Sequence, residues 1–568
     1  MYLRILIIIL LAFAIESCKE DSEIDLIIKN ANIYAVDTTY AADAIAISNN
    51  KIFKIGYWKD LKSEINDSTK VIDAQGHFVM PGFIEGHGHY AGLGYSMINL
   101  NFLLAKSWEE VVSNVATKTK ETPKGVWIIG RGWHQEKWDS IPKQQMYNYP
   151  FHYSLSAVSP NNPVVLYHAS GHALFANKKA MDIVGISKET PNPVGGEILR
   201  DSNGDAIGVF EERAMRMFQD KYDAYIASLD KEILDSIWYS AIVKAEDECL
   251  KKGITSFQDA GSTFDELDKY EKLANEGKMR VRLWAMLRES ADKMVERAAT
   301  YKKINVGGNH FFTCNAIKSE VDGALGAFGA WLIEPYSDKP GFKGQNTTDI
   351  YEVKKIADIA MKNDMQFCVH AIGDRANRVV LDIYEGVMAQ QKEQKDLRWR
   401  IEHAQHLNPD DIPRFAKNKI IASMQGIHCT SDAPFVVKRL GEQRARTGAY
   451  AWRSLLAQGV LVANGTDAPV EDVDPLKSFY ASVTRKRTDS GKAFFPEQAM
   501  TRAEAIYSYT LGNAYAAFED KLKGSLRPGK LADLVILSND LIKCTDDEIL
   551  NTKVLYTISD GKIMYKYE

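Results

Sequence analysis

The stretch Pro81-Gly82-Phe83-Ile84-Glu85-Gly86-His87-Gly88-His89 carries the strongest single indication of the fold in this chain. An apolar run typical of a buried strand ends there in two histidines separated by one residue. Alternate side chains of a strand share a face, so both imidazoles can reach the same metal ion. A structural pair of histidines in a core or on a surface has the same pattern, so this motif alone leaves both interpretations open.

Three later segments end in residues of the same chemical kind. Phe367-Cys368-Val369-His370 and Arg400-Ile401-Glu402-His403 each end in a histidine, and Gly465-Thr466-Asp467 places an aspartate after another apolar run. The carboxyl ends of parallel barrel strands meet at one mouth. We therefore expect these side chains to converge although they lie far apart in the sequence.

These segments belong to a series of short apolar runs that alternate with helical patterns. The alternation predicts an α/β fold with a parallel sheet, and eight such units predict a (β/α)8 barrel of the TIM type over residues 80–519. The expected strands are Gly82–His87, Ile254–Phe257, Val281–Leu287, Ala316–Val321, Gln366–His370, Trp399–Glu402, Ile420–Met424 and Gly459–Ala463. Thr501-Arg502-Ala503-Glu504 has the pattern of a capping box that opens a final helix toward Ala517.

Both ends of the chain, and part of a long stretch after the first barrel strand, contain strand-like runs outside the barrel. Residues 19–79 and 520–568 are expected to form one composite β-sandwich domain from both ends of the chain. Residues 91–250, after the first barrel strand, contain strand-like runs of their own at Val126–Ile129 and Val164–Tyr167. We expect this stretch to be a long insertion near the barrel mouth, where loops after strand ends bind substrates.

The first residues have the pattern of a secretory signal. An eleven-residue apolar run follows Arg4, whereas spanning a bilayer takes about 20 residues. Ile15-Glu16-Ser17-Cys18 then resembles a bacterial lipobox, although Glu16 departs from the small or apolar residue usual there. Residues 1–18 are expected to be a signal peptide with Cys18 as the lipid attachment site, which predicts a lipoprotein of a bacterial cell envelope, periplasmic or surface-exposed. An ordinary signal peptide with a chance cysteine is the alternative.

Composition narrows the class of function. The chain has 568 residues, 45% of them hydrophobic and 26% charged, and its 70 basic and 75 acidic side chains give a net charge of −5. This balance provides no attraction to nucleic acid, and it leaves the expected lipid anchor as the membrane contact. A small-molecule enzyme fits this charge balance better.

The remaining cysteines are scattered and odd in number, which predicts reduced thiols rather than a disulfide framework or a thiolate zinc site. They are Cys249, Cys314, Cys368, Cys429 and Cys544.

Lys318 lies in the fourth expected strand, in Lys318-Ser319-Glu320-Val321-Asp322-Gly323. An ammonium group that faces two divalent cations tends to lose its proton. The neutral amine can capture carbon dioxide as a carbamate, whose two oxygens can bridge two metals. An ordinary surface lysine is the other interpretation of this residue.

The order H-x-H, Lys, His, His, Asp on successive strands resembles the amidohydrolase superfamily. In finer detail the chain is similar to the YtcJ-like branch, which includes N-substituted formamide deformylases, and the similarity covers nearly all of the mature chain. The matching segments are Trp127–Trp133, Ser170–Ala173, Lys318–Gly323, His370–Ala376, Ile401–Gln405, Gly448–Arg453, Gly465–Val470 and Pro528–Asp533. Two departures stand out: Glu85 replaces the aspartate usual before the histidine pair, and Gln425-Gly426 replaces a frequent Gln-Pro.

The resemblance implies a barrel with a composite β-sandwich and a binuclear metal site. It implies hydrolysis of a non-peptide C–N bond in a small-molecule amide, with N-substituted formamides as one class, through a metal-bridging hydroxide. Asp467 is the expected catalytic proton shuttle, and zinc the expected metal. The implied ligands are His87, His89 and Asp467 for one metal, His370 and His403 for the second, and carboxylated Lys318 as the bridge. From their positions, His172, Asp322 and Gln425 are further candidates for substrate binding.

Other functions remain compatible with the sequence. A cyclic-amide or lactone hydrolase can use the same metal ligands. Deaminases of the superfamily resemble single-metal sites with a glutamate three residues after the fifth-strand histidine, where this chain has Gly373. A catalytically silent binding lipoprotein would be expected to have lost ligands, whereas all six are present. The sequence does not indicate an oligomeric state.

Overall fold

The computed structural model describes residues 23–102, 105–133, 135, 138–140, 142–146, 149–168, 173–193, 196–326, 328–391 and 395–568. Cys18 and His172 lie outside the described residues. The chain divides into two compact units, one made of residues 1–89 and 248–568 and the other of residues 90–247. Within the described part of the chain, no helix combines the length and apolar character needed to cross a membrane.

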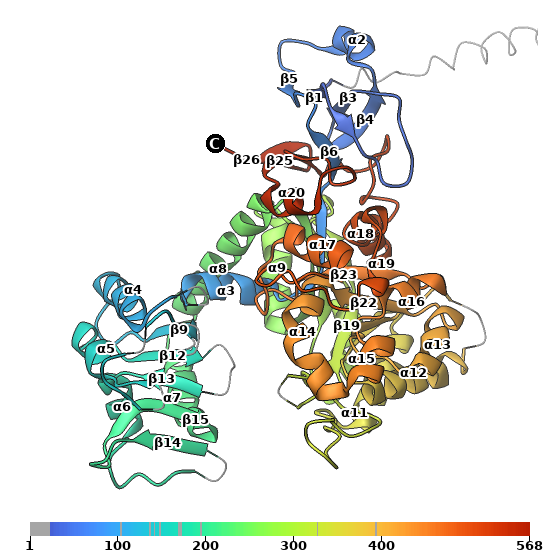
Figure 1. Cartoon of the computed structure of the whole chain (residues 1–568). Coiled ribbons are helices and arrows are strands. Elements are labelled where there is room, and N and C mark those ends of the chain that lie inside the picture. The colour runs from blue at the N-terminus through green and yellow to red at the C-terminus, as the bar shows by residue number, and fades with distance from the viewer. Residues whose placement is uncertain are drawn as a thin grey trace, which may run out of the picture. The chain divides into compact units, whose positions relative to one another are not determined.

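Eight parallel strands form a nearly closed barrel in the first unit (Figure 1). Every expected barrel strand is confirmed, with bounds that differ by a few residues. In spatial order they are β7 (Phe83–Gly88), β16 (Ile254–Ser262), β17 (Arg282–Leu287), β19 (Phe312–Glu320), β20 (Gln366–Ala371), β21 (Arg400–His403), β22 (Ile421–Gln425) and β23 (Val462–Gly465). A short strand, β18 (Lys303–Val306), pairs antiparallel with β19. The strands are almost entirely buried, which explains why they appear in the sequence as short apolar runs.

Helices connect the strands and pack their apolar sides toward the barrel. In α12 (Asp374–Met388), for example, Val380, Leu381, Tyr384 and Val387 recur at helical spacing and are buried. The others are α9 (Phe264–Asn275), α10 (Ala291–Arg297), α11 (Ile350–Lys362), α13 (Ile412–Lys417), α14 (Gly426–Leu440), α15 (Glu442–Gly448), α16 (Trp452–Ala457), α17 (Pro475–Thr484), α18 (Arg502–Ser508) and α19 (Leu511–Ala516).

The last barrel helix differs from its prediction. The capping box of Thr501 and Glu504 is present, but the helix it opens does not continue to Ala517. It stops after Ser508, because the backbone of Thr510 leaves the helical region, at φ −132° and ψ −96°. The break allows the carbonyl of Tyr509 to accept a hydrogen bond from Ile84 N–H in β7 at 2.8 Å. A tertiary contact with the first strand thus divides this segment into α18 and α19.

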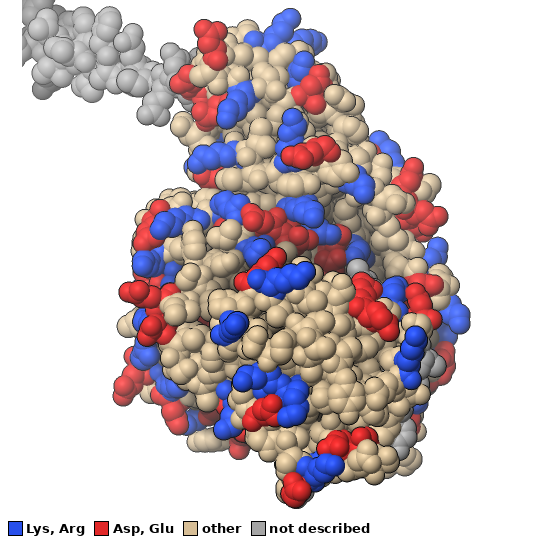
Figure 2. All heavy atoms as spheres, turned by 90° about the vertical axis from the view of Figure 1, so that its left-hand side faces the viewer, with Lys and Arg blue, Asp and Glu red and all other residues tan. Residues whose placement is uncertain are grey.

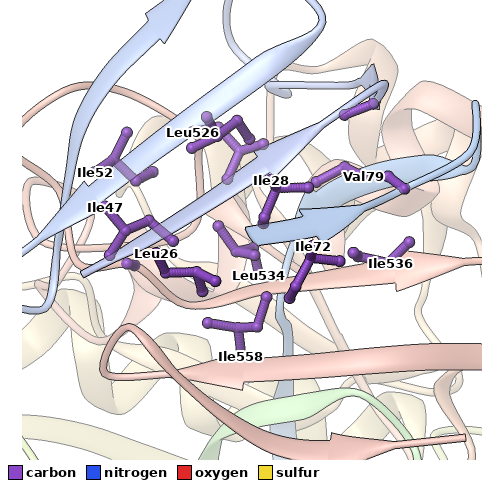
Figure 3. Packing of buried hydrophobic residues seen from close by; sticks show 14 of the residues in the cluster. Leu26, Ile28, Ile47, Ile52, Ile72, Val79, Leu526, Leu534, Ile536 and Ile558 are labelled. Carbon is purple, nitrogen blue, oxygen red and sulfur yellow. The ribbon is translucent and has the colours of Figure 1, made fainter. Parts of the chain in front are cut away.

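Two sheets lie outside the barrel in this unit, one made of N-terminal strands alone and one that combines strands from both ends of the chain. One has the order β4 (Lys51–Gly56), β3 (Ala44–Ser48), β1 (Leu26–Lys29), β5 (Lys70–Asp73). The other has the order β2 (Asn32–Ile33), β6 (Phe78–Pro81), β24 (Leu534–Leu537), β25 (Val554–Ser559), β26 (Lys562–Lys566). Their buried side chains, among them Ile28, Ile47, Leu534 and Ile558, form one shared core (Figure 3). Strand β6 leads almost directly into β7, so this core adjoins the start of the barrel.

The second unit is built on a six-stranded sheet. Val164 and Leu166 belong to one hydrophobic core and the intervening Val165 to another, so both faces of the sheet are covered. Its strands are β8 (Leu100–Asn101), β9 (Ile128–Trp133), β12 (Val164–His168), β13 (Ala173–Ala176), β14 (Gly196–Arg200) and β15 (Ala206–Glu212). The helices of this region are α3 (Tyr90–Ile98), α4 (Trp108–Glu121), α5 (Tyr153–Val158), α6 (Lys178–Val184), α7 (Arg216–Ala227) and α8 (Lys231–Lys251).

Many charged side chains lie on the surface (Figure 2), and most of the described cysteine thiols lie inside. Acidic and basic residues are interspersed over the face that Figure 2 shows. Among the described residues the cysteines are free: Cys249, Cys314, Cys368 and Cys429 are buried and Cys544 is partly buried.

Candidate active site

The expected metal ligands converge at the carboxyl ends of the barrel strands. His87 and His89 come from the end of β7 and Lys318 from β19, while His370, His403 and Asp467 come from β20, β21 and the loop after β23. Five of these residues line a cavity of about 340 Å³. They are His89, Lys318, His370, His403 and Asp467. His87 is fully buried behind them.

Three of these side chains are close enough to share one ion. Ligand atoms of His87, His403 and Asp467 all lie within 4.8 Å of one another. Asp467 Oδ1 is 3.2 Å from Nε2 of His89 and 3.6 Å from Nε2 of His87. The imidazole of His403 lies between two others, with ring centroids 4.6 Å from His87 and 4.4 Å from His370. Four histidines and a carboxylate thus surround one small volume.

The backbone turns sharply at two of these residues. His403 has a φ of +71° and Asp467 a φ of +58°, both in the left-handed region that L-residues seldom adopt. Such strained positions cluster at functional sites, where the surrounding structure maintains them.

Buried polar atoms at this centre have no hydrogen-bond partner. They are Nε2 of His87, Nε2 of His370 and Oδ1 of Asp467, whose 3.2 Å approach to His89 is an ion-pair contact without hydrogen-bond geometry. Buried polar atoms are usually paired, because an unpaired one costs about 1–3 kcal/mol. Imidazole nitrogens and carboxylate oxygens are zinc ligands, so a divalent cation would satisfy all three atoms. The residues present therefore fit a metal site.

Burial keeps the imidazoles in the neutral state that binds a metal. Burial, together with the charge of Lys318, lowers the pKa of His87 to about 4 and that of His370 to about 3. The pKa of His403 also lies well below its ordinary value, because of burial and the neighbouring histidines. At neutral pH these rings consequently present nitrogen lone pairs rather than positive charge.

Lys318 has the properties expected of an amine that can lose its proton. Its side chain is buried, and Nζ donates to the carbonyl of Ala260 at 3.3 Å. Burial lowers the pKa of the ammonium group, although Glu402 and Asp467 act in the opposite direction.

A buried ion-pair network orients the His87 ring through its Nδ1 atom. Nδ1 of His87 lies 2.5 Å from Oε2 of Glu402, whose other oxygen accepts from Nε of Arg400 at 2.6 Å. Burial alone would raise the pKa of Glu402, but Arg400 and His87 lower it well below its ordinary value. The carboxylate therefore accepts the Nδ1 proton and leaves Nε2 of His87 free for a metal. The strand-end motif does not indicate this role of Glu402; the sequence feature that could have indicated it is the charged pair Arg400 and Glu402 inside a buried strand.

Gln425 holds a second histidine in the same way. Its Oε1 lies 2.8 Å from Nδ1 of His403, and its side chain is fully buried. The amide oxygen accepts the Nδ1 proton, so Nε2 of His403 is available for a metal. Substrate binding by Gln425 stays a prediction.

Asp322 lies behind His370 and supports the backbone there. Its carboxylate accepts N–H hydrogen bonds from Ile372, Gly373 and Trp331 at 2.8–2.9 Å. Burial raises its pKa to about 7 although these backbone donors act in the opposite direction. Oδ1 is 3.7 Å from Nε2 of His370. This carboxylate thus orders the loop after β20, and a contact with substrate stays a prediction.

The structure accounts for Glu85, the first departure from the family pattern. Its carboxylate accepts from the backbone N–H of Thr466 at 2.6 Å and from the Thr466 hydroxyl at 3.1 Å. A Cβ at Gly465 would lie 2.4 Å from Oε1 of Glu85 and 2.6 Å from the backbone nitrogen of His87, so only glycine fits there. Glu85 thereby fixes the residue immediately before Asp467.

Gly426, the second departure, begins α14. Its N–H donates to Oδ1 of Asn464 at 2.9 Å, a bond that proline cannot form. A Cβ at this position would lie 2.2 Å from Oγ of Ser482 and 2.7 Å from the carbonyl of Ser478. Glycine is needed here because the first turn of α14 packs directly against α17.

Comparison with known proteins identifies the family. The sequence pattern described as "Amidohydrolase family" matches residues 70–565. The chain belongs to the amidohydrolase family. The resemblance inferred from its motifs is therefore confirmed.

Relatives of this amidohydrolase extend over almost its whole length. It is 33% identical to Protein LONG AFTER FAR-RED 3 of Arabidopsis thaliana, with 95% of this chain and 91% of the relative covered. It is 29% identical to the putative amidohydrolase YtcJ of Bacillus subtilis, with 92% and 96% covered. It is 28% identical to the N-substituted formamide deformylase of Arthrobacter pascens, with 95% and 98% covered.

The fold has a counterpart among solved structures. An uncharacterized metal-dependent hydrolase from Pyrococcus horikoshii OT3 superposes with a TM-score of 0.73 at 25% identity. The superposition covers 92% of this chain and 99% of that protein.

Proposed function

We propose that this amidohydrolase hydrolyses a non-peptide C–N bond in a small-molecule amide, with N-substituted formamides as the first class to test. The observation that carries the proposal is the set of unpartnered ligand atoms of His87, His370 and Asp467 beside a buried lysine. A binding protein would gain nothing from keeping these costly buried atoms. The N-substituted formamide deformylase of Arthrobacter pascens supports the choice of substrate class.

The six expected ligands are the residues that would hold two divalent cations, zinc being the first choice. We assign His87, His89 and Asp467 to one cation, His370 and His403 to the second, and the carbamate of Lys318 to both. When bound, two such cations lower the pKa of a water molecule toward 7 and polarise the substrate carbonyl.

Asp467 is the residue we propose to move the proton. Burial alone would raise its pKa, but the neighbouring histidines, His89 foremost, lower it well below its ordinary value. The carboxylate is thus ionised before reaction and can accept a proton. Transfer of that proton to the substrate nitrogen converts the nitrogen into a neutral amine leaving group when the C–N bond breaks. The lined cavity of about 340 Å³ has the size of a small-molecule site.

The proposal is tested by hydrolysis assays on the metal-loaded protein. The panel contains N-substituted formamides, other secondary amides, cyclic amides and lactones. Turnover of acyclic amides is expected, with release of one amine per carboxylate. Turnover of only cyclic amides or lactones would replace the proposed substrate class, and turnover of none would refute amide hydrolysis.

A pair of histidine variants ties any activity to the site. His370→Ala removes an expected ligand, so it should lose both bound metal and activity. His310→Ala is the matched control. His310 lies in the turn before β19, at the end of that strand opposite the expected ligand Lys318. It should retain both properties. Full metal content and activity in His370→Ala would show that this strand end is not a ligand position.

We also propose that the chain is a bacterial envelope lipoprotein attached through Cys18. The proposal comes from the sequence of residues 1–18. In cells, Cys18→Ala should move the protein from the membrane fraction to the soluble fraction. Cys544→Ala is the control, because this thiol belongs to the folded part of the chain. Equal membrane attachment of both variants would refute the anchor.

A further inference from the structure

We propose that His428 is a further catalytic residue, which donates a hydrogen bond from Nε2–H to the oxygen of the substrate bound in the active-site cavity. This inference rests on the proposed function of the same site. The strand-end motifs do not include His428, which lies on a helix.

The position of His428 places it beside the expected metal ligands. It lies in the first turn of α14, directly after barrel strand β22, and it lines the same cavity as His370 and Asp467. Its ring is nearly parallel to that of His403, with an interplanar angle of 9° and centroids 6.2 Å apart. The His428 ring therefore stacks beside the ring of His403, an expected metal ligand.

The hydrogen bonds of His428 determine which nitrogen carries the proton. Nδ1 lies 2.9 Å from Nε2 of Gln405, an amide nitrogen that can only donate. Nδ1 must therefore accept, and the neutral ring must carry its proton on Nε2. The side chain is only 6% exposed, and Nε2 has no hydrogen-bond partner. A buried donor without a partner, on a side chain that lines a cavity, is costly unless a ligand atom completes it.

The remaining walls of the cavity make oxygen the expected partner. Asp432, one turn further along α14, accepts from the hydroxyl of Tyr450 through Oδ2 at 2.5 Å, and neither of its oxygens is hydrogen-bonded to Nε2 of His428. Leu325 and Phe435, which also line the cavity, are apolar. A carbonyl oxygen, or the negative oxygen that develops from it during hydrolysis, is the acceptor that an amide offers to Nε2–H.

Two substitutions separate the two nitrogens of His428. The side-chain amide of asparagine reaches about as far as Nδ1, and that of glutamine about as far as Nε2. His428→Asn should therefore lose the donor toward the cavity, and His428→Gln should retain one there. The expected loss of kcat/KM is about 5- to 100-fold for His428→Asn, the range of one buried hydrogen bond, with substantial recovery in His428→Gln. Metal content should stay unchanged in both variants.

His406→Leu is the matched control. His406 is a buried histidine of the neighbouring loop whose two ring nitrogens have no partner, and it is not among the residues lining the cavity. Its replacement should leave kcat/KM unchanged. A loss shared by His406→Leu and both His428 variants would indicate a general effect of removing a buried ring, and it would overturn the inference.

A measurement independent of turnover tests the donor itself. N-butylmethanesulfonamide offers acceptor oxygens but no hydrolysable amide, so its binding can be measured by calorimetry. Its affinity should fall about 5- to 100-fold in His428→Asn and less in His428→Gln. In ¹⁵N-histidine spectra, the signal that disappears in His428→Asn should belong to a ring protonated at Nε2.

The outcomes distinguish this inference from the proposed function. Absence of amide turnover together with weaker sulfonamide binding in His428→Asn would refute the proposed function and keep His428 as a hydrogen-bond donor to a bound ligand oxygen. Amide turnover together with equal kcat/KM and equal probe affinity in wild-type protein and both variants would overturn the inference alone. Protonation at Nδ1, or no binding of the probe to the wild-type protein, would also overturn it.

Discussion

Oε2 of Glu402 lies 2.5 Å from Nδ1 of His87, and neither side chain is exposed to solvent. Because Arg400 keeps this carboxylate ionised, the contact determines both the tautomer and the direction of the His87 ring. The metal site is thus prepared by residues of the barrel interior as well as by the ligands themselves.

Replacing the charge of Glu402 should weaken metal binding. Glutamine has a similar shape but is a weaker acceptor for His87, and it leaves Arg400 without its counter-ion. We expect Glu402→Gln to lower zinc affinity about 10- to 100-fold, as measured by equilibrium dialysis. Glu442→Gln, at an exposed ion pair with Arg446, should leave affinity unchanged. Equal affinity of wild-type protein and Glu402→Gln would show that Glu402 does not orient His87.

Enlarging Gly426 should disturb the first turn of α14. Its added Cβ would clash with Ser482 and with the backbone of Ser478, so Gly426→Ala should lower the melting temperature and reduce kcat/KM. Ser482→Ala removes the nearer of the two clashes and should restore part of both losses. Gly386→Ala, in a helix position with open space around it, should be neutral or stabilising. A fully active Gly426→Ala variant would contradict the close packing seen here.

Asn513 joins the first and last barrel strands. Its side-chain amide donates to the carbonyl of Ile84 at 2.6 Å and to that of Asn464 at 2.7 Å. Asn513→Leu would leave both buried carbonyls unpaired, which should cost about 2–5 kcal/mol of the free energy of unfolding. Asn551→Leu, at an exposed helix end, should have little effect. Urea unfolding measures both, and equal midpoints for the two variants would argue against this role of Asn513.

His406 should make the protein sensitive to acid. Burial lowers its pKa from 6.5 to about 3, so between these values the unfolded chain binds a proton that the folded chain does not. The free energy of unfolding therefore decreases as pH falls below 6.5, by about 2 kcal/mol at pH 5 from this residue. His406→Leu should remove this contribution, so its stability relative to wild type should increase from pH 7.5 to pH 5. A pH-independent difference in urea unfolding would contradict the assignment.

Much of the fold could be predicted from the sequence, because parallel strands buried on both faces appear as short apolar runs. The convergence of His87, His370, His403 and Asp467 followed from one rule, that barrel strands end at a common mouth. The division of α18 from α19 could not be predicted. Its cause is a hydrogen bond from Ile84, more than 400 residues away in the chain, to Tyr509.

The supporting residues of the site were harder to recognise than the ligands. Glu402 and Arg400 are charged residues in a buried strand, and their function is evident only once His87 is seen opposite them. The role of Glu85 depends on the space left by Gly465. His428 lies on a helix, so the spacing of strand residues did not indicate it. Contacts between distant segments decide all of these roles.

The central claim is that six side chains of this barrel bind two divalent cations. Metal per chain, measured on the full-length protein after loading with zinc and bicarbonate and removal of free ions, tests it most directly. We predict about two zinc ions per wild-type chain, and a clear loss in Lys318→Ala, which cannot form the carbamate. No tightly bound zinc in the wild-type protein, or the same zinc content in Lys318→Ala, would contradict the claim.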